Sequence, residues 1–248
     1  MGATDWSELS DNALQANVPH GVINAAAIGG SPPGSGSSFV YAMNSAINSA
    51  AVVASYTTVS GFSPVAKGAS ISGAIQRCVS GGPSGWSVWL FAALQGGSSL
   101  FSAYALGLAD GGTGAHIVLQ RAPLSFGMAD NAPGTANSGT LARGTATYPP
   151  GTWVQLMLEV VCNTNGDVVL NCYQNDLTVV DASVQTPTWA PVPGISQFID
   201  DAVGANVSNL LAQNPQSPLA PGFVGWGMQS SQAARRAAIS TVQIAAQL

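Results

Sequence analysis

The chain has 248 residues, of which 46% are hydrophobic and only 7% are charged, and its formal net charge is −5. Disordered chains are rich in charge and poor in apolar residues, so this composition excludes a disordered chain and predicts a folded protein whose surface is built from uncharged polar residues. The sequence holds six basic residues and no basic run, which argues against a nucleic-acid partner. It also lacks the uninterrupted apolar run of about 18 residues that predicts a membrane span.

The N-terminal residues 1–37 carry no strong periodic pattern, so we expect an irregular N-terminal arm that docks onto a neighbouring subunit. Residues 1–12 hold three acidic residues where a secretory signal has a basic and then an apolar region, which predicts synthesis in a cytoplasm. Stretches rich in Gly, Ser, Gln and Pro at 29–38 and 213–222 are predicted loops. Because the composition is the same on both sides of these loops, residues 38–248 are predicted to form a single domain.

Short strand candidates then follow one another along the chain, separated by Gly, Ser and Pro. They are Ser38–Met43, Ser49–Thr57, Ser70–Arg77, Ser87–Leu94, Ser102–Leu108, His116–Gln120, Gly222–Gly227 and Ala237–Ile244. Strands of this length and spacing predict an all-β protein with two packed antiparallel sheets. The segment Ser196–Leu211 differs, because its apolar residues recur at steps of three and four, and we expect one short helix there that covers a sheet edge or an end of the sandwich.

The clearest strand pair is Trp153–Cys162 followed by Asp167–Gln174. The first strand alternates with period two, which is typical of a strand with one buried face. Its predicted apolar face consists of Val154, Leu156, Leu158 and Val160. The four residues 163–166, Asn-Thr-Asn-Gly, readily adopt positive φ, as a hairpin loop requires.

Candidate catalytic residues are few. A Ser or Cys nucleophile needs a base, and the chain has two histidines, His20 and His116, neither accompanied by a G-x-S-x-G motif. We expect both to be structural, His20 in a turn and His116 at the start of a strand, bonded to a backbone carbonyl. A glycosidase needs two carboxylates that flank the scissile bond, but the two glutamates, Glu8 and Glu159, lie far apart in the sequence. The sequence therefore predicts a protein that is not an enzyme and binds no cofactor.

The adjacent acids Asp200 and Asp201 are the one candidate for a metal site. A calcium ion would bind to them together with Asn206 or backbone carbonyls, because hard cations prefer oxygen ligands. The alternative, which we favour, is that the two acids begin the predicted helix, where its positive end stabilises negative charge.

The three cysteines, Cys78, Cys162 and Cys172, stand at spacings that match no zinc or redox motif. We expect three reduced and partly buried thiols, since free cysteine is among the most buried residue types. Intermolecular disulfides within an assembly are the alternative.

Tryptophan is the candidate residue for contact with a ligand. Trp89, Trp153 and Trp226 each lie within a predicted strand, so core positions are expected for all three. Trp189 lies in the irregular segment 187–191, between two prolines, and is the candidate contact or sugar-stacking residue.

Several of these stretches occur in a familiar order. They are Ala103–Asp110, His116–Arg121, Gly151-Thr152-Trp153 with its strand, Asn165–Leu170, Gly222–Gly227 and Ile239–Ile244. This series resembles the concanavalin A-like (laminin-G-like) jelly roll over roughly residues 38–247, and the low-charge, Ala/Ser/Gly-rich version of it is similar to virion proteins of tailed bacteriophages. The resemblance implies an antiparallel two-sheet jelly-roll sandwich, which here would carry one short helix and the N-terminal arm.

The resemblance also implies a function and a location. It implies a non-enzymatic structural protein of a tailed-phage virion, such as a capsid decoration (cement), collar or tail-associated protein, that is made in the host cytoplasm and contacts other virion proteins and copies of itself. A surface poor in Lys and Glu fits this role, because both residues are depleted at protein interfaces. The alternative is a lectin-like carbohydrate-binding module that adsorbs to host surface glycans.

Overall fold

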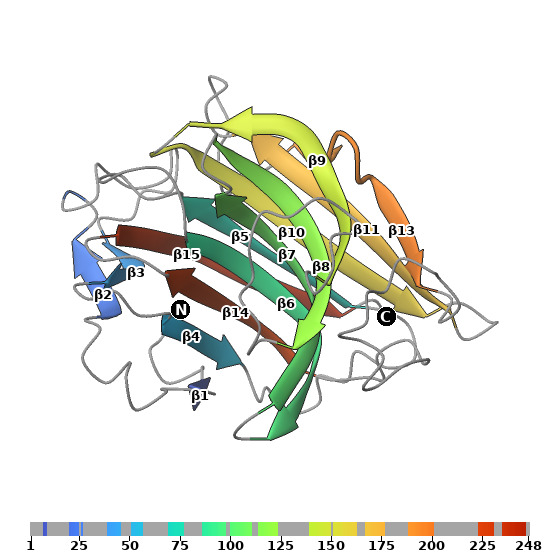
Figure 1. Ribbon diagram of the computed structural model, residues 1–248, viewed down its shortest axis with the longest axis horizontal. Helices are drawn as coiled ribbons and strands as arrows, with labels where there is room; N and C mark the ends of the chain where they lie inside the picture. The colour runs from blue at the N-terminus through green and yellow to red at the C-terminus, as the bar shows by residue number, and fades with distance from the viewer. Residues whose placement is uncertain are drawn as a thin grey trace.

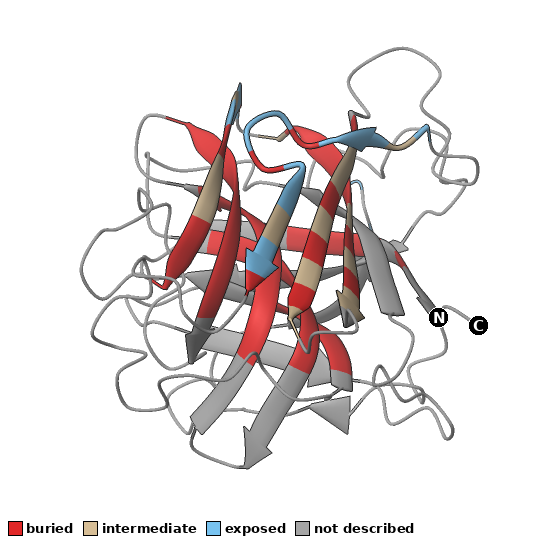
Figure 2. Cartoon of the chain, turned by 90° about the vertical axis from the view of Figure 1, so that its right-hand side faces the viewer, coloured by how far each residue is buried: buried red, intermediate tan, exposed pale blue. Residues whose placement is uncertain are grey.

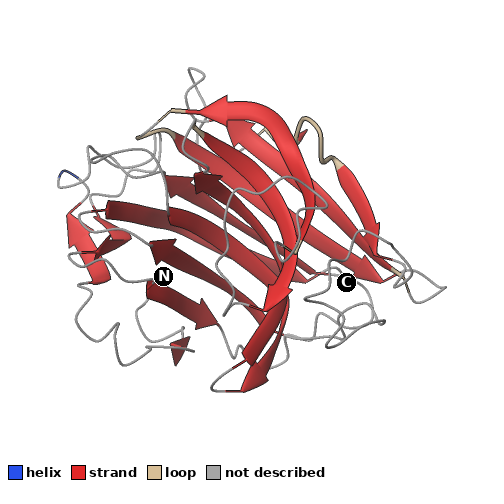
Figure 3. Cartoon of the chain, viewed as in Figure 1, coloured by secondary structure: helices blue, strands red, loops and turns tan. Residues whose placement is uncertain are grey.

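The structure is a computed structural model of residues 1–248, and nearly all of the residues it describes lie in β-strands (Figure 1, Figure 3). It describes residues 7–8, 20–24, 26, 39–45, 51–56, 69–76, 86–97, 100–110, 114–123, 139–149, 151–162, 167–176, 188–200, 223–230 and 235–246. Within these ranges no helix is long and apolar enough to cross a membrane.

The strands form two antiparallel sheets. The seven-stranded sheet has the order β1 (Ser7–Glu8), β4 (Ala51–Tyr56), β14 (Phe223–Ser230), β6 (Trp86–Gly97), β7 (Leu100–Asp110), β8 (Ala115–Pro123) and β9 (Thr140–Tyr148). The eight-stranded sheet has the order β12 (Ala190–Pro191), β11 (Val168–Asp176), β10 (Trp153–Cys162), β5 (Ala69–Gln76), β15 (Arg235–Ala246), β3 (Phe39–Ser45) and β2 (His20–Asn24), and β13 (Gln197–Asp200) also pairs with β11. The predicted two-sheet antiparallel architecture is therefore confirmed.

The predicted strands and the predicted hairpin are present. Each of the eight single strand candidates corresponds to one observed strand, with ends that differ by a few residues. In the hairpin, β10 pairs with β11 in a continuous register from Val154 opposite Asp176 to Cys162 opposite Val168. The turn at 163–166 and the predicted loops at 29–38 and 213–222 lie outside the described residues.

The predicted helix at Ser196–Leu211 is wrong at its start. Gln197–Asp200 is the strand β13, which pairs antiparallel with β11, so that Asp200 does not begin a helix. The apolar spacing of this segment fits a helix, but pairing with the open edge of β11 satisfies its backbone groups and overrides that local preference. The remainder, residues 201–211, lies outside the described part of the chain.

The N-terminal segment contains two short strands where an irregular arm was expected. The strand β2 pairs with β3 through five residues, and β1 pairs with β4 through two. These strands belong to the edges of the two sheets of the same chain. The division of the chain at residues 37 and 38, and the docking of residues 1–37 onto another subunit, stay predictions.

The hydrophobic core lies between the sheets and draws side chains from both of them. On β10 the predicted apolar face is confirmed, because all four of its side chains are at most 4% exposed: Val154, Leu156, Leu158 and Val160. They meet apolar side chains of the facing sheet, such as Leu90 on β6 and Leu106 on β7. The alternation appears in Figure 2 as bands of buried and intermediate residues along neighbouring strands.

Candidate functional site

The outer face of each sheet, meaning the face turned away from the other sheet, is where a ligand could bind. On the seven-stranded sheet the outward side chains of β6 and β8 are shielded from solvent, and Trp89, Phe91, Val118 and Gln120 are all at most 1% exposed. Among the described residues of this sheet, accessible side chains occur on β9 and at Pro149 just after it. Among the residues of this sheet whose side-chain exposure the structure describes, none on this face is an accessible aromatic residue.

His116 ties β8 to β9 on that face. Its Nδ1 lies 2.8 Å from a terminal guanidinium nitrogen of Arg143, and its Nε2 lies 3.2 Å from the Thr147 hydroxyl. Because a guanidinium only donates hydrogen bonds, Nδ1 is the acceptor and Nε2 carries the ring proton. His116 thus begins its strand as expected, and these two partners are side chains of β9. The prediction that His20 lies in a turn is wrong, because His20 begins β2 and pairs with Met43 of β3. The side chain of His20 lies outside the described set.

The outer face of the eight-stranded sheet presents a different surface at its β10–β11–β12–β13 edge. We define the edge platform as five of the accessible side chains on this face: Glu159 of β10, Asn171 and Tyr173 of β11, Gln197 of β13, and Trp189 just before β12. The sequence of β11 explains their placement, because Val168, Leu170 and Cys172 are buried and the residues between them must point outward.

Three polar members of the edge platform form a ladder across three strands. The register places Asn171 opposite Glu159 on one side and opposite Gln197 on the other. The Gln197 amide donates to Asn171 Oδ1 at 2.9 Å, and the Asn171 amide donates to Glu159 Oε2 at 2.7 Å. Because each bond uses one end of the Asn171 amide, the two bonds together fix its orientation.

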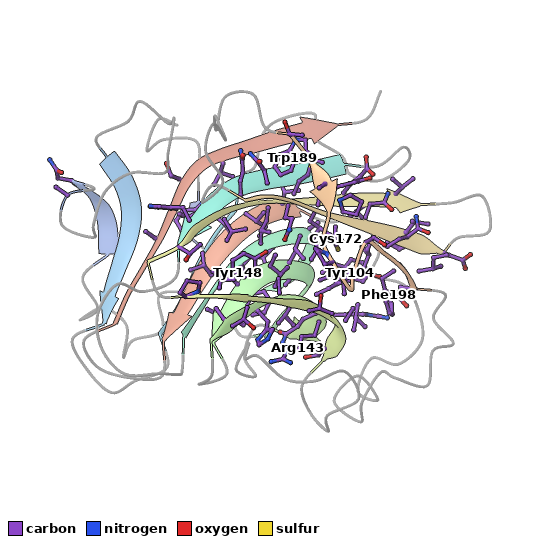
Figure 4. The ribbon with its side chains drawn as sticks, turned by 90° about the horizontal axis from the view of Figure 1, so that it is seen from above. Tyr104, Arg143, Tyr148, Cys172, Trp189 and Phe198 are labelled. Carbon is purple, nitrogen blue, oxygen red and sulfur yellow. The ribbon has the colours of Figure 1, made fainter. Side chains whose placement is uncertain are left out.

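The two aromatic members follow one another along β11, Tyr173 two residues from Asn171 of the ladder and Trp189 further on, next to Ala190, which pairs with Gln174. Tyr173 is opposite Pro191, and Val192, one residue further, is buried in the core at 1% exposure. Alternation along the strand therefore turns Trp189 and Pro191 outward, on the same face as Tyr173. In Figure 4, Trp189 and Arg143 lie on opposite outer sides of the sandwich, with Tyr104, Tyr148 and Cys172 between them.

Burial and a neighbouring charge act on the Tyr173 hydroxyl of the edge platform. Partial burial raises the pKa of Tyr173 above its usual value, and the negative charge of Glu159 raises it further. Tyr173 therefore keeps its hydroxyl proton at neutral pH. Beneath the platform, burial raises the pKa of the Cys172 thiol to about 12, so this free cysteine is a protonated core residue and not a nucleophile.

A buried cluster at Asp200 anchors β13 to the opposite sheet. Asp200 Oδ2 accepts a hydrogen bond from the Tyr104 hydroxyl at 2.5 Å and forms an ion pair with Arg121 at 2.8 Å. Tyr104 and Arg121 belong to β7 and β8, so this cluster crosses the interior of the sandwich. All three residues are at most 4% exposed. The cluster therefore fixes the strand that carries Gln197.

Two further hydrogen bonds join β9 of the seven-stranded sheet to β11 and to Pro193, which follows β12. The Tyr148 hydroxyl of β9 donates to the side-chain oxygen of Gln174 on β11 at 2.6 Å. The Thr145 amide of β9 donates to the Pro193 carbonyl at 3.0 Å. On the outer face, the Asn175 amide donates to Gln155 at 3.0 Å and joins β11 to β10. The strands that carry the edge platform are thus held by bonds on both faces.

The possible calcium site at Asp200 and Asp201 is not tested by the structure. The Asp200 carboxylate is directed into the interior toward Arg121, while Asp201 and Asn206 lie outside the described residues. No group of three His, Cys, Asp or Glu side chains in the described ranges is arranged to hold a metal ion.

Trp189 is the one platform residue that was a candidate from the sequence, and four others were missed. Trp189 is partly exposed on the platform. Trp89, Trp153 and Trp226 are all buried, at 1%, 6% and 3% exposure, but only Trp226 belongs to the predicted core between the sheets. Trp89 and Trp153 alternate with the core residues Val88 and Val154 and therefore point to the outer faces.

The missed residues are Glu159, Asn171, Tyr173 and Gln197. Period-two alternation in the first strand of the predicted hairpin already placed Glu159 on the face opposite Val154 and Val160. The second strand has three successive apolar residues near its start, so its sequence did not separate the face of Asn171 and Tyr173. Gln197 had no such signal either, because its segment was predicted to be helical.

Comparison with known proteins shows the fold. No protein-family model matches the chain, and no curated protein sequence matches it. Among solved structures, the PL-14 alginate lyase from Aplysia kurodai is 13% identical with a TM-score of 0.50, and covers 99% of this chain and 100% of its own. The potassium-bound carbohydrate recognition domain of Emp46p is 10% identical with a TM-score of 0.50, covering 99% and 90%. A protein of unknown function from Shewanella oneidensis is 11% identical with a TM-score of 0.51, covering 98% and 78%.

These likenesses confirm the concanavalin A-like jelly-roll sandwich that the sequence motifs indicated. They show the fold alone, because all three identities are low, and the same fold serves a lyase and a sugar-recognition domain. They do not link the chain to virion proteins. The function must therefore be argued from the site.

Proposed function

We propose that this protein is a lectin-like carbohydrate-binding module and that the edge platform is its binding site. The observation that carries the proposal is the combination of Trp189 and Tyr173 with a ladder of planar polar groups on one accessible sheet face. Aromatic rings cover the apolar C–H faces of a sugar ring, and amides and carboxylates bond its hydroxyl groups. A sheet edge held from both sides presents these groups with little loss of side-chain entropy on binding.

The same geometry supports binding without catalysis. Glycoside hydrolysis uses two carboxyl groups about 5–9.5 Å apart. Asp167 immediately precedes β11 and is four residues from Asn171, the partner of Glu159, so it lies about 13 Å from that pair. Asp200 is turned into the core toward Arg121. Glu159 thus stands on the platform without a second carboxylate at catalytic distance among the described residues.

Trp189→Ala and Tyr173→Ala are each expected to weaken glycan binding by roughly ten-fold, which corresponds to about 1.4 kcal/mol of binding free energy. Each substitution removes a ring that stacks on the sugar, an interaction in the range of about 0.5–1.5 kcal/mol beyond the area it buries. A glycan array followed by titration calorimetry on the best ligand measures the effect. Thr145→Ala is the matched control, because Thr145 is exposed on the opposite sheet. A wild-type protein that binds no glycan, or two variants that bind as tightly as wild type, would contradict the proposal.

A structural role on a tailed-phage virion is the second candidate, and the composition supports it. With 7% charged residues, the chain has a surface that can be covered by neighbours at a low desolvation cost. Ile199 of the edge strand β13 is 51% exposed, which suits a protein contact. Mass spectrometry of purified particles is expected to find the protein in stoichiometric amounts, and its presence in infected-cell lysate but never in particles would defeat this role. Both roles hold together if the module is mounted on the particle.

A further inference from the structure

We propose that Glu159 makes the edge platform selective for neutral glycans and excludes acidic ones. This inference rests on the carbohydrate-binding function proposed above and goes further, since it names the class of ligand and the residue that selects it. The two acidic classes concerned are sugars with a carboxylate and sugars with a sulfate group, which share a fixed negative charge.

The position of Glu159 is central to the inference. It occupies the β10 end of the Gln197–Asn171–Glu159 ladder, on the strand next to the one that carries Tyr173. Tyr173 is two residues along β11 from Asn171, which makes it the diagonal neighbour of Glu159, and diagonal neighbours lie about 7–8 Å apart. A sugar ring stacked on Tyr173 is therefore expected to lie about 7 Å from the Glu159 position on the neighbouring strand.

The hydrogen bonds of the ladder have one direction, and Glu159 accepts the last of the two. Gln197 donates to Asn171, and Asn171 donates to Glu159, so both bonds run toward the carboxylate. An ionised carboxylate only accepts hydrogen bonds, with room for about four, whereas a sugar hydroxyl can both donate and accept. Hydroxyl groups can therefore donate to this end of the ladder. A ligand carboxylate or sulfate only accepts and would meet an acceptor there.

Charge acts in the same direction as the hydrogen-bond pattern. Glu159 contributes to the raised pKa of Tyr173, which shows that its negative charge is felt at the aromatic ring. None of the five edge-platform residues is basic, and the whole chain carries a net charge of −5. At separations of about 7 Å near a protein surface, repulsion between two unit charges is large enough to change affinity by roughly ten-fold.

The test compares a neutral oligosaccharide with its uronate-containing and sulfated counterparts, for wild type, Glu159→Gln and Asp167→Asn, by titration calorimetry. Wild type is expected to bind the neutral ligand roughly ten-fold more tightly than either acidic one. Glu159→Gln removes the charge at constant shape and keeps an oxygen that accepts from Asn171, so we expect the preference to fall to within about two-fold. Asp167→Asn removes the same charge from a position about 13 Å along the sheet and is expected to leave the preference unchanged.

The possible failures are distinguishable. Wild type that binds acidic and neutral ligands equally, or a Glu159→Gln variant that keeps the full preference, would overturn the selectivity while leaving the binding function in place. Wild type that binds none of the three ligands would overturn the binding function together with the selectivity. Matching thermal unfolding curves for the three proteins show that each variant is folded, and a Glu159→Gln variant that unfolds early is replaced by Glu159→Ser in the same comparison.

Discussion

Asp200→Ala is expected to lower the free energy of unfolding by about 3–5 kcal/mol, because it leaves the Arg121 guanidinium buried without its carboxylate partner. The Arg121–Asp200 contact is 2.8 Å long, and neither side chain is more than 5% exposed. Removing one partner of a buried ion pair costs far more than the net stabilisation that the pair provides, since the remaining charge is shielded from water and has no opposite charge to compensate it. Urea unfolding monitored by tryptophan fluorescence measures the change.

Two comparison variants separate charge from packing at this cluster. Tyr104→Phe removes one hydrogen bond to the carboxylate and is expected to cost about 1.5–3 kcal/mol. Arg121→Met combined with Asp200→Leu replaces the pair with apolar side chains and is expected to recover much of the loss, as buried pairs elsewhere do. Ordinary surface substitutions change the free energy of unfolding by at most about 0.5 kcal/mol. If Asp200→Ala changes it by no more than that, the cluster does not anchor β13.

Gly107→Ala is expected to destabilise the protein by about 3 kcal/mol, the upper end of the usual range for overpacking. Gly107 of β7 pairs with Trp89 of β6, and a Cβ atom at this glycine would lie inside van der Waals contact with the Trp89 ring and the Val88 carbonyl oxygen. The ring cannot move away, because Trp89 is 1% exposed and its indole nitrogen donates to the Ser87 hydroxyl at 2.5 Å. The carbonyl oxygen belongs to the sheet backbone, which cannot yield without loss of strand pairing.

Gly151→Ala is the matched control for this substitution. A Cβ atom at Gly151 meets no atom within 4 Å, and the residue has φ +78°, so its cost is conformational strain of about 1–2 kcal/mol without a clash. Gly107→Ala should therefore lower the urea midpoint further than Gly151→Ala does. Without the clash, the change at Gly107 would stabilise the strand, because alanine loses less conformational entropy than glycine on folding. Equal shifts for the two variants would show that Trp89 does not pack against Gly107 as the structure has it.

A strand could be predicted from the sequence where its own residues identify its buried face. In β10 the apolar positions alternate cleanly, and residues 163–166 are typical of a hairpin turn, so this strand and its pairing with β11 followed from the sequence. In β9, the residues Ala142 to Ala146 mix small, charged and polar types, and the register with β8 shifts twice, so no clean alternation marked this strand. Strand β13 was mistaken for a helix because four residues are too few to establish a period.

The candidate site was predictable only in part, for a related reason. Trp189 stood out because a tryptophan in a proline-flanked irregular segment has no core position to fill. Asn171 and Tyr173 belonged to the predicted hairpin, but nothing local showed that they would share an outer face with Trp189 and Gln197. That shared face requires β12 and β13 to add to the same edge of β11, which is a long-range pairing.

The sequence by itself determined the all-β class, the Trp153–Gln174 hairpin and the buried face of β10, because these follow from period-two alternation and turn residues that act over a few positions. The tertiary structure alone decided that Gln197–Asp200 is a strand, since the competing helical pattern lost to the backbone bonds of β11 and to the ion pair that holds Asp200 inside. It also decided that Glu159, Asn171 and Gln197 form one ladder. Local preferences amount to tenths of a kcal/mol per residue, whereas a buried charge without its partner costs about 3–5 kcal/mol, so the long-range partner prevailed.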